Sequence, residues 1–263
     1  MNNILNKEEN FHDNWALNEN VDIDFIKNVT ADTSPELKFL FEEMGDVKDK
    51  EVLDIGSGLG EFGLYLSYKG AKVTLLDISS EMLKFSKKIA NKNNLNIEII
   101  HGDINKIKIN KKFDIIYAGN YLHHVNIHES ILTIRSLLKD QGSFYSWDPL
   151  KYNFFINIYR KIANDVRTED EHPLSYEDIN LIKNNFNFVK EKYFWLFSLF
   201  TFIYMVFFQL KNPNKVRLWK EVVNKSSNYK YIYRPLSLFD EFFLKKFPYF
   251  RKYCWNVALV CKK

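Results

Sequence analysis

The amino-acid sequence predicts an α/β protein with a doubly wound, mainly parallel sheet. Strand and helix patterns alternate from Glu51 to Pro149, and three glycines at alternate positions follow the first of these strands. Alternation at this spacing is typical of a parallel sheet with helices on both faces. A chain of 263 residues is long enough to bury one large core.

The predicted strands are short apolar runs that end at polar residues or glycines. Five precede residue 150 and two follow it, at 52–55, 72–76, 97–100, 113–118, 143–147, 188–197 and 253–261. Apolar spacing and capping residues predict helices at 61–68, 80–91, 127–139, 152–163 and 175–185. A polar loop is expected at 167–173.

Three regions are expected along the chain. Residues 1–48 are polar with helical spacing and predict an N-terminal helical cover. Residues 49–150 form the alternating core, and residues 151–263 are expected to add a cap and closing strands to the same domain. Within this last region, residues 198–250 predict an aromatic, mostly helical insertion.

Charge is divided unevenly between the two ends of the chain. From Lys190 to Lys263 there are 15 Lys and Arg against 4 Asp and Glu, a net of +11, whereas residues 1–189 carry 22 against 29, a net of −7. A basic, aromatic tail suggests an anionic partner or a membrane surface, although lysines that merely solvate an exposed face explain it equally well. Nucleic acid is not expected, because residues 1–189 are acidic and no separate RNA-binding module is visible.

The uncharged run at 193–210 raises the question of a membrane span. Its 18 residues, nine of them aromatic, just reach the length that a spanning helix requires. Because its first part is better explained as a strand, packing in the core or at an interface is favoured over spanning. The start of the chain has no signal-peptide pattern, which predicts a cytoplasmic location, with peripheral contact at the inner membrane face through 198–250 as an open alternative.

The two cysteines, Cys254 and Cys261, are expected on one strand. Seven residues of strand span about 23 Å. That separation is too long for a disulfide, so none is expected.

The loop after the first strand carries Gly56, Ser57, Gly58 and Gly60. Glycines allow a tight turn against which a ligand can lie, and the helix that follows offers free backbone N–H donors. The spacing of Gly58, Gly60 and Gly63 also satisfies the dinucleotide-binding pattern, so the glycines by themselves leave the ligand open.

The positions of three acidic residues help to decide which ligand the glycine loop binds. Asp54, Asp77 and Asp103 end the first three strands, and the carboxyl ends of parallel strands meet in one crevice. Three carboxylates there suit a cationic adenosine ligand without phosphates better than a pyrophosphate.

Together, these motifs resemble those of class I S-adenosylmethionine-dependent methyltransferases, in particular the small-molecule group, over residues 51–149. The resemblance implies a Rossmann-like sheet with an antiparallel last strand, and S-adenosyl-L-methionine as cofactor. It implies contacts from Asp77 to the ribose, from Asp103 to the adenine and from backbone near Asn120 to the methionine moiety. The full cofactor site is then expected to comprise Asp54, Gly56, Ser57, Gly58, Gly60, Asp77, Ile78, Met82, Asp103, Ile104 and Asn120.

Two histidines follow the fourth strand at the mouth of the predicted crevice. We hypothesise that His123 or His124 removes a proton from the acceptor and that Asp148, at the end of the fifth strand, orients the histidine or contacts the acceptor. The histidines could equally begin the next helix and pack on the cofactor. No metal is expected, because adjacent histidines do not easily bind one ion and no further Cys or His has suitable spacing.

The acceptor pocket is expected in the segment after the fifth strand. Its predicted residues are Tyr152, Arg160, Arg167 and His172, with the arginines pairing a phosphate or carboxylate, although a solvated loop is an even alternative. Phe11, Trp15 and Phe62 are expected apolar walls.

The predicted activity is methyl transfer by in-line displacement to an O or N atom of a small or lipid-linked acceptor. The alternatives are a nicotinamide-dependent oxidoreductase that uses the same glycines and a non-catalytic protein that binds S-adenosylmethionine. Oligomeric state is left open.

Overall fold

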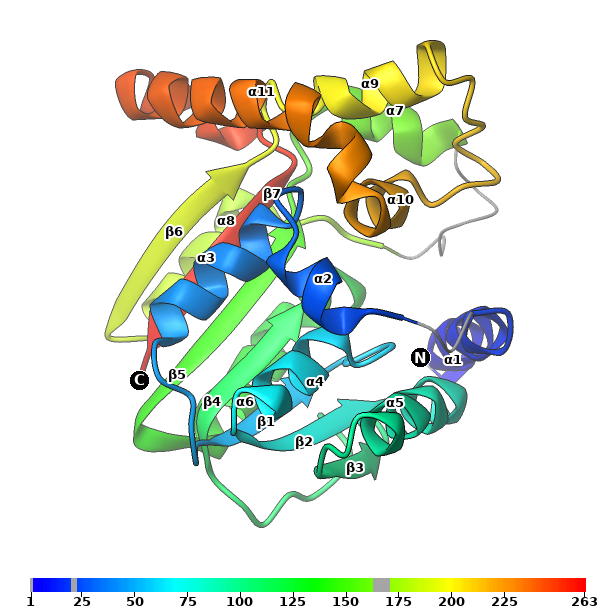
Figure 1. The fold of residues 1–263 in the computed structure, drawn as a ribbon. Coiled ribbons are helices and arrows are strands. Elements are labelled where there is room, and N and C mark those ends of the chain that lie inside the picture. Colours follow the sequence, from blue (N-terminus) through cyan, green and yellow to red (C-terminus); the bar gives the residue numbers. More distant parts are fainter. Residues whose placement is uncertain (1, 20–22, 163–170) are drawn as a thin grey trace.

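The computed structural model describes residues 2–19, 23–162 and 171–263. Its centre is a seven-stranded sheet in the order β3-β2-β1-β4-β5-β7-β6 (Figure 1). All neighbouring strands are parallel except that β7 runs antiparallel to both β5 and β6. The strands are β1 Glu51–Ile55, β2 Lys72–Asp77, β3 Ile97–His101, β4 Phe113–Gly119, β5 Leu138–Pro149, β6 Phe188–Phe194 and β7 Asn256–Lys262. The predicted Rossmann-like sheet with an antiparallel last strand is thus confirmed.

Helices cover both faces of this sheet. Those before residue 150 are α1 Asn2–Leu17, α2 Phe25–Thr30, α3 Pro35–Met44, α4 Glu61–Tyr68, α5 Ser80–Lys92, the 3₁₀ turn η1 Leu122–His124 and α6 Ile127–Leu137. Those after it are α7 Phe154–Ile162, α8 Tyr176–Asn184, α9 Phe200–Phe207, α10 Leu218–Asn224, α11 Ser226–Lys246 and the 3₁₀ helix η3 Pro248–Tyr253.

The buried side chains form two clusters, one on each face of the sheet. Adjacent strand residues contribute to opposite clusters: Val52 packs with α3, α4 and α5, whereas Leu53 packs with α6 and α8. This alternation follows from the period of two residues along a strand. Gly63 allows α4 to lie close to the sheet, because a Cβ there would come within 2.7 Å of Asp54 Oδ2.

Several predicted boundaries are shifted. Helix α6 ends at Leu137 and β5 begins at Leu138, where the sequence pattern predicted a helix to Lys139. Strand β7 begins only at Asn256, so Cys254 lies before it rather than on the same strand as Cys261. Both cysteines are free and buried.

The N-terminal helix α1 packs against α5. The hydroxyl of Ser79 donates to Asp13 Oδ1 over 2.5 Å, and the backbone N–H of Glu81 donates to the same oxygen over 3.2 Å. Asp13 therefore supplies an acceptor at the start of α5, which fixes α1 near the carboxyl ends of β1 and β2.

The uncharged run at 193–210 divides into the end of β6, a short connection and α9. Thr201, Phe202 and Met205 of this helix are buried. Among the described helices, none has the length and apolar character needed to cross a membrane. Helix α9 instead lies with α7 and α11 at one end of the molecule (Figure 1).

Candidate active site

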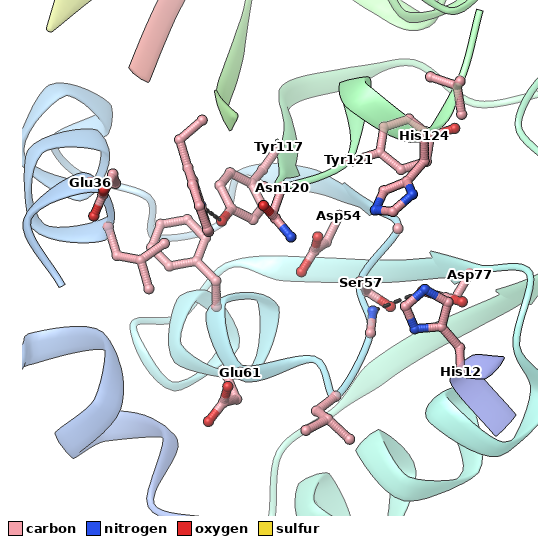
Figure 2. A pocket seen from close by; sticks show the side chains of 18 of the residues that line it. His12, Glu36, Asp54, Ser57, Glu61, Asp77, Tyr117, Asn120, Tyr121 and His124 are labelled. Atoms are coloured by element: carbon pink, nitrogen blue, oxygen red, sulfur yellow. Dashed lines mark hydrogen bonds between the residues drawn. The ribbon is translucent and has the colours of Figure 1, made fainter. Parts of the chain in front are cut away.

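A cavity of about 670 Å³ opens at the carboxyl ends of the central strands (Figure 2). Figure 2 shows Glu36 and Asp77 on opposite sides of it, with Asp54 and Asn120 between them. We call the side lined by the ends of β1 to β4 the loop half. The side lined by Trp147, Trp195, Phe202, Trp219, Trp255 and Glu36 is the aromatic half.

In the loop half, the glycine turn has the backbone that its sequence predicts. Gly56 has φ +61° and Gly58 has φ +53°, a region that side chains disfavour. A Cβ at Gly56 would also lie 2.4 Å from the ring of Tyr121. Asp77 holds this turn, since its carboxylate accepts from the backbone N–H of Gly58 and of Ser79, each over 2.8 Å.

Two of the predicted acids are buried side by side. Burial, together with the nearby charge of Asp77, raises the pKa of Asp54 well above its ordinary value. Burial also raises the pKa of Asp77, although its two backbone donors act in the opposite direction. A cationic ligand would relieve the repulsion between these carboxylates.

The loop half also offers an unused polar group. Within the described residues, the buried hydroxyl of Ser57 has no hydrogen-bond partner. Buried polar groups usually have one, so this hydroxyl is available to a ligand. The acids, the glycine turn and this hydroxyl fit S-adenosylmethionine.

Most of the predicted cofactor residues line the cavity: Asp54, Gly56, Ser57, Gly58, Asp77, Ile78, Asp103, Ile104 and Asn120. Two of the predicted residues do not. Gly60 lies in the turn itself, where its N–H donates to Ser57 O over 2.8 Å. Met82 is fully buried on the inner side of α5, with its N–H bonded to the Ser79 hydroxyl. Gly60 and Met82 thus contribute to the structure around the glycine turn without lining the cavity.

The two histidines of η1 have different surroundings. His123 is only 2% exposed, and its Nδ1 lies 2.8 Å from Oδ1 of the fully buried Asp148. Burial raises the pKa of the Asp148 carboxyl well above its ordinary value, against the effect of three backbone donors. His124 lines the cavity, and its ring lies 4.0 Å from that of His123. The pair is thus an outer imidazole in tilted contact, at 42° between the ring planes, with a fixed inner one.

Helix α1 adds two residues that the sequence motifs did not reveal. Oε1 of Glu8 lies 3.4 Å from Nδ1 of His124, and Glu8 also lies 3.5 Å from His12. Glu8 is buried and lines the cavity together with His12 and Trp15. No local motif could identify them, because α1 reaches the cavity only through its packing on α5. Phe62 also lines the cavity, whereas Phe11 does not.

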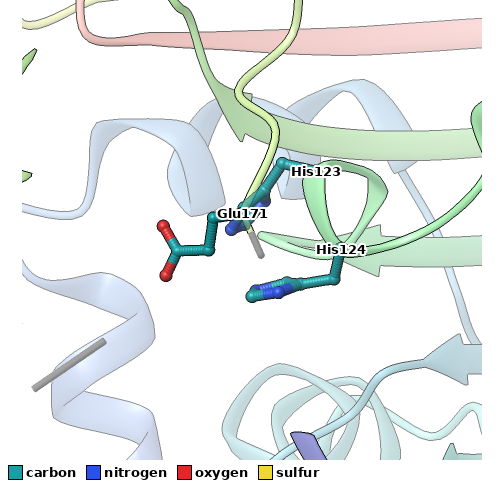
Figure 3. A group of neighbouring side chains, drawn as sticks. All are labelled: His123, His124 and Glu171. Atoms are coloured by element: carbon teal, nitrogen blue, oxygen red, sulfur yellow. The ribbon is translucent and has the colours of Figure 1, made fainter. Parts of the chain in front are cut away.

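The two adjacent histidines, which were not expected to bind one ion easily, lie close enough together with a third residue to do so. His123, His124 and Glu171 come together, with one potential ligand atom of each within 4.8 Å of the others (Figure 3). The tight η1 turn directs both imidazoles to one side, which spacing along an extended chain would not allow. These three residues could therefore hold a cation.

Among the predicted acceptor residues that the structure describes, only His172 lines the cavity. Its backbone N–H donates to His123 O over 2.7 Å. Tyr152 instead stacks on Tyr176, and Arg160 donates to Asn157, so neither belongs to the cavity wall. Arg160 lies on α7 and Tyr152 lies just before it, and neither side chain reaches the crevice. Arg167 lies outside the described residues.

The aromatic half contains a buried acid that sequence patterns missed. Trp195 and Trp255 contact the ring of Phe202 at centroid distances of 5.1 Å each. Among them, Glu36 accepts from Asn256 Nδ2 over 2.7 Å, and burial raises its pKa to about 7. This half can enclose an apolar molecule and offer it one polar contact.

Known proteins resemble the central part of the chain. A ubiquinone biosynthesis O-methyltransferase of Rickettsia bellii is 25% identical over 111 residues, covering 40% of this chain and 46% of that protein. A histone-arginine methyltransferase of Drosophila erecta is 31% identical over 105 residues, covering 38% of this chain and 20% of that protein. The matches thus span less than half of these relatives.

Solved structures share the fold over a longer stretch. A protein of Bacillus halodurans assigned as a methyltransferase has a TM-score of 0.56 at 15% identity, covering 87% of this chain and 99% of that one. A magnesium protoporphyrin IX methyltransferase of Synechocystis with bound SAH has a TM-score of 0.50 at 18% identity, covering 61% and 75%.

The family model described as "Methyltransferase domain" matches residues 46–228, which is well over half of the chain. This match supports the methyltransferase interpretation over the nicotinamide-dependent oxidoreductase that the glycine spacing left open. The chain belongs to the methyltransferase-domain family and is a class I S-adenosylmethionine-dependent methyltransferase.

Proposed function

We propose that this enzyme transfers a methyl group to an oxygen or nitrogen atom of a small apolar or lipid-linked acceptor, with His124 as the base. The observation that carries the proposal is the position of His124, which lines the same cavity as the acids of the loop half and the tryptophans of the aromatic half. Donor and acceptor can therefore meet beside an imidazole.

S-adenosylmethionine, when bound, supplies a methyl group that its positively charged sulfur has already activated. The residues that would hold it are Asp54, Asp77 and Asp103 with the glycine turn. The protein's remaining task is to align the acceptor and to exclude water, because alignment accounts for much of the rate of a displacement reaction. Helix α1 covers the loop half and serves that exclusion.

A cavity-facing imidazole favours a hydroxyl acceptor, since a hydroxyl must lose its proton as the new bond forms. Glu8, 3.4 Å from His124 Nδ1, would stabilise the imidazolium that results. His123 would position the His124 ring through their close ring contact, and Asp148 would fix His123 in turn. His123 and Asp148 are thus positioning residues.

The aromatic half supports an apolar acceptor. Its walls are tryptophan and phenylalanine rings, which recognise aromatic or unsaturated groups by stacking. The Rickettsia bellii relative is named for ubiquinone biosynthesis, which agrees with an acceptor of this chemistry. An apolar acceptor of low solubility would be reached at a membrane surface, so peripheral membrane contact would accompany the reaction without being part of its chemistry.

The test is a transfer assay with isotopically labelled S-adenosylmethionine and a panel of hydroxylated aromatic and polyprenyl compounds. With the best acceptor, we expect His124→Asn to lower kcat by about 100-fold or more. Binding of the demethylated cofactor, measured by calorimetry, should stay within about twofold.

His128→Asn is the matched control, because His128 lies on the exposed surface of α6 and should leave kcat unchanged. A His124→Asn enzyme with normal kcat would exclude His124 as the base. Calorimetric binding without turnover on any acceptor would favour a non-catalytic binding protein instead.

A further inference from the structure

The exposed apolar side chains of this molecule are concentrated on one face. Among the described residues, 16 of the 21 exposed large hydrophobic side chains lie on α7, α9, α11 or η3, just after α9, or at Phe247, which joins α11 to η3. The other five are single residues on α1, α4, β3, α6 and β6. Scattered apolar residues are ordinary, but a gathered set marks an interaction surface.

Helix α11 shows the pattern best. Tyr231, Leu238 and Phe242 recur at helical spacing on its exposed side, with exposures of 76%, 68% and 65%. The opposite side, with Tyr229 and Tyr233, is buried. A helix on the surface of a globular domain normally turns polar residues outward, whereas the outer stripe of α11 is apolar and stays uncovered by the described part of the chain.

A chain of ring contacts links the stripe to the other helices. Phe155 of α7 lies 6.5 Å from Phe200 of α9, which lies 6.5 Å from Phe197. Phe197 in turn lies 4.9 Å from Phe239 and 5.1 Å from Phe243 of α11. We call this continuous surface of α7, α9, α11 and η3 the outer face.

Charge identifies the partner of the outer face. Residues 225–253 carry seven Lys and Arg but only Asp240 and Glu241 as acids. Asp240 is buried and accepts from the Ser198 hydroxyl and three backbone N–H groups, while Glu241 pairs with Lys192. Lys245 and Lys246 are exposed on the same helix as the apolar stripe. Apolar residues flanked by cations match an anionic bilayer surface.

The outer face is also the reverse side of the aromatic half. Phe202 lines the cavity, whereas Phe207 and Phe208, at the end of the same helix, are 71% and 76% exposed. Likewise η3, whose Tyr249 is 69% exposed, leads directly into Trp255 of the cavity wall. A molecule held in a bilayer against the outer face is therefore separated from the cavity by one layer of helices.

From this we infer that the outer face docks the enzyme on an anionic lipid bilayer, with the aromatic side chains in the interfacial region and the lysines at the headgroups. The further statement that the acceptor enters from that bilayer rests on the proposed function. Docking itself does not, and can be measured without any transfer reaction.

The test is co-sedimentation of the full chain, without cofactor, on vesicles of phosphatidylcholine with phosphatidylglycerol and on vesicles of phosphatidylcholine alone. We expect binding to the anionic vesicles that weakens with salt. Leu238→Ser with Phe242→Ser, and Lys245→Glu with Lys246→Glu, should each weaken the partition by about tenfold or more.

The matched controls are Leu132→Ser on α6 and the pair Lys88→Glu with Lys108→Glu, all at exposed positions away from the outer face. Circular dichroism and calorimetry with the demethylated cofactor check that each variant folds. Equal sedimentation of the outer-face variants and their controls would overturn the inference. So would a dimer in light scattering that the outer-face variants abolish, since a second copy would then cover the face.

The two proposals fail separately. Sedimentation without methyl transfer would support docking and reject the proposed function. Transfer that persists while no variant or lipid affects sedimentation would reject docking alone.

Discussion

The loop half and the aromatic half of the cavity enclose one space, yet their walls come from very different stretches of chain. Every predicted cofactor residue that lines the loop half lies between Asp54 and Asn120, at or just after the ends of adjacent parallel strands. The aromatic half is assembled from Glu36, Trp147, Trp195, Phe202 and Trp255, which are separated by most of the chain. The loop half is therefore built from residues that are close in sequence, whereas the aromatic half depends on how distant helices pack.

The two halves also differ in how they treat charge. In the loop half, paired carboxylates are buried near an available cavity, where a cation can compensate them. In the aromatic half, a single carboxyl is buried among rings, where protonation compensates it. The comparison teaches that one cavity can favour a charged donor and an uncharged acceptor. Four predictions test it.

The largest expected effect concerns Glu36 and folding stability. In the folded protein, burial raises the pKa of Glu36 from 4.5 to about 7, so the folded state keeps a proton that the unfolded state loses. The contribution of Glu36 to stability should therefore be largest below pH 4.5 and fall as the pH rises through about 7. The shift corresponds to about 3 kcal/mol of unfolding free energy.

Urea unfolding over this pH range should show a loss that is smaller by about 3 kcal/mol in Glu36→Gln, which keeps the shape of the side chain, than in the wild type. Glu42→Gln, at an exposed position of the same helix, is the control. Parallel stability curves for the wild type and Glu36→Gln would show that Glu36 does not titrate as its burial implies.

The next effect concerns cofactor affinity. Asp77→Asn removes a buried negative charge. It also places an amide donor where two backbone N–H groups already need an acceptor. We expect binding of S-adenosylmethionine to weaken by about 100-fold, because charge-assisted hydrogen bonds contribute about 2–3 kcal/mol. Calorimetry measures this. Asp140→Asn, at an exposed position, should bind as the wild type does, and unchanged affinity in Asp77→Asn would remove Asp77 from the cofactor site.

A smaller effect should separate the two halves directly. Phe202→Leu reduces the ring contacts with Trp195 and Trp255 and should raise the KM for an apolar acceptor by about tenfold. The affinity for the demethylated cofactor should not change. Phe188→Leu, on the exposed side of β6, is the control. Equal losses of cofactor and acceptor binding would show that the halves are not independent.

The smallest expected effect is that of a chelator. If His124 acts as a base, treatment with EDTA should change kcat by less than about twofold, because proton transfer requires no metal. A large loss that a divalent cation restores would assign His123, His124 and Glu171 to a metal site. Glu171→Gln distinguishes a base from a metal site, since it should leave kcat nearly unchanged if His124 acts as a base without a metal.

Much of the core could be predicted from the sequence because it rests on local signals. Strands β1 to β4 and helices α4 and α5 lie within two residues of their predicted ends, since glycines and capping residues mark them. The boundary between α6 and β5 was less accurate, because Leu137 and Leu138 are apolar in either element and only pairing with β4 decides between them.

The acceptor side was predicted poorly for a related reason. Tyr152 and Arg160 follow the fifth strand in sequence and were expected in the pocket, but they contact Tyr176 and Asn157 and do not line the cavity. Glu8 and Glu36 reach the cavity from helices whose local patterns indicate only an amphipathic cover. Their functional surroundings depend on long-range packing, which no short motif encodes.

By itself, the sequence determined the doubly wound sheet, the glycine turn and the order of the acids along it, because backbone geometry and strand period act over a few residues. Only the tertiary structure decided that His124 rather than His123 faces the cavity, that Glu36 is buried among tryptophans, and that the outer stripe of α11 lacks a protein partner among the described residues. Those features depend on which distant surfaces meet, and burial by a remote helix leaves no periodic signal in the residues that it covers.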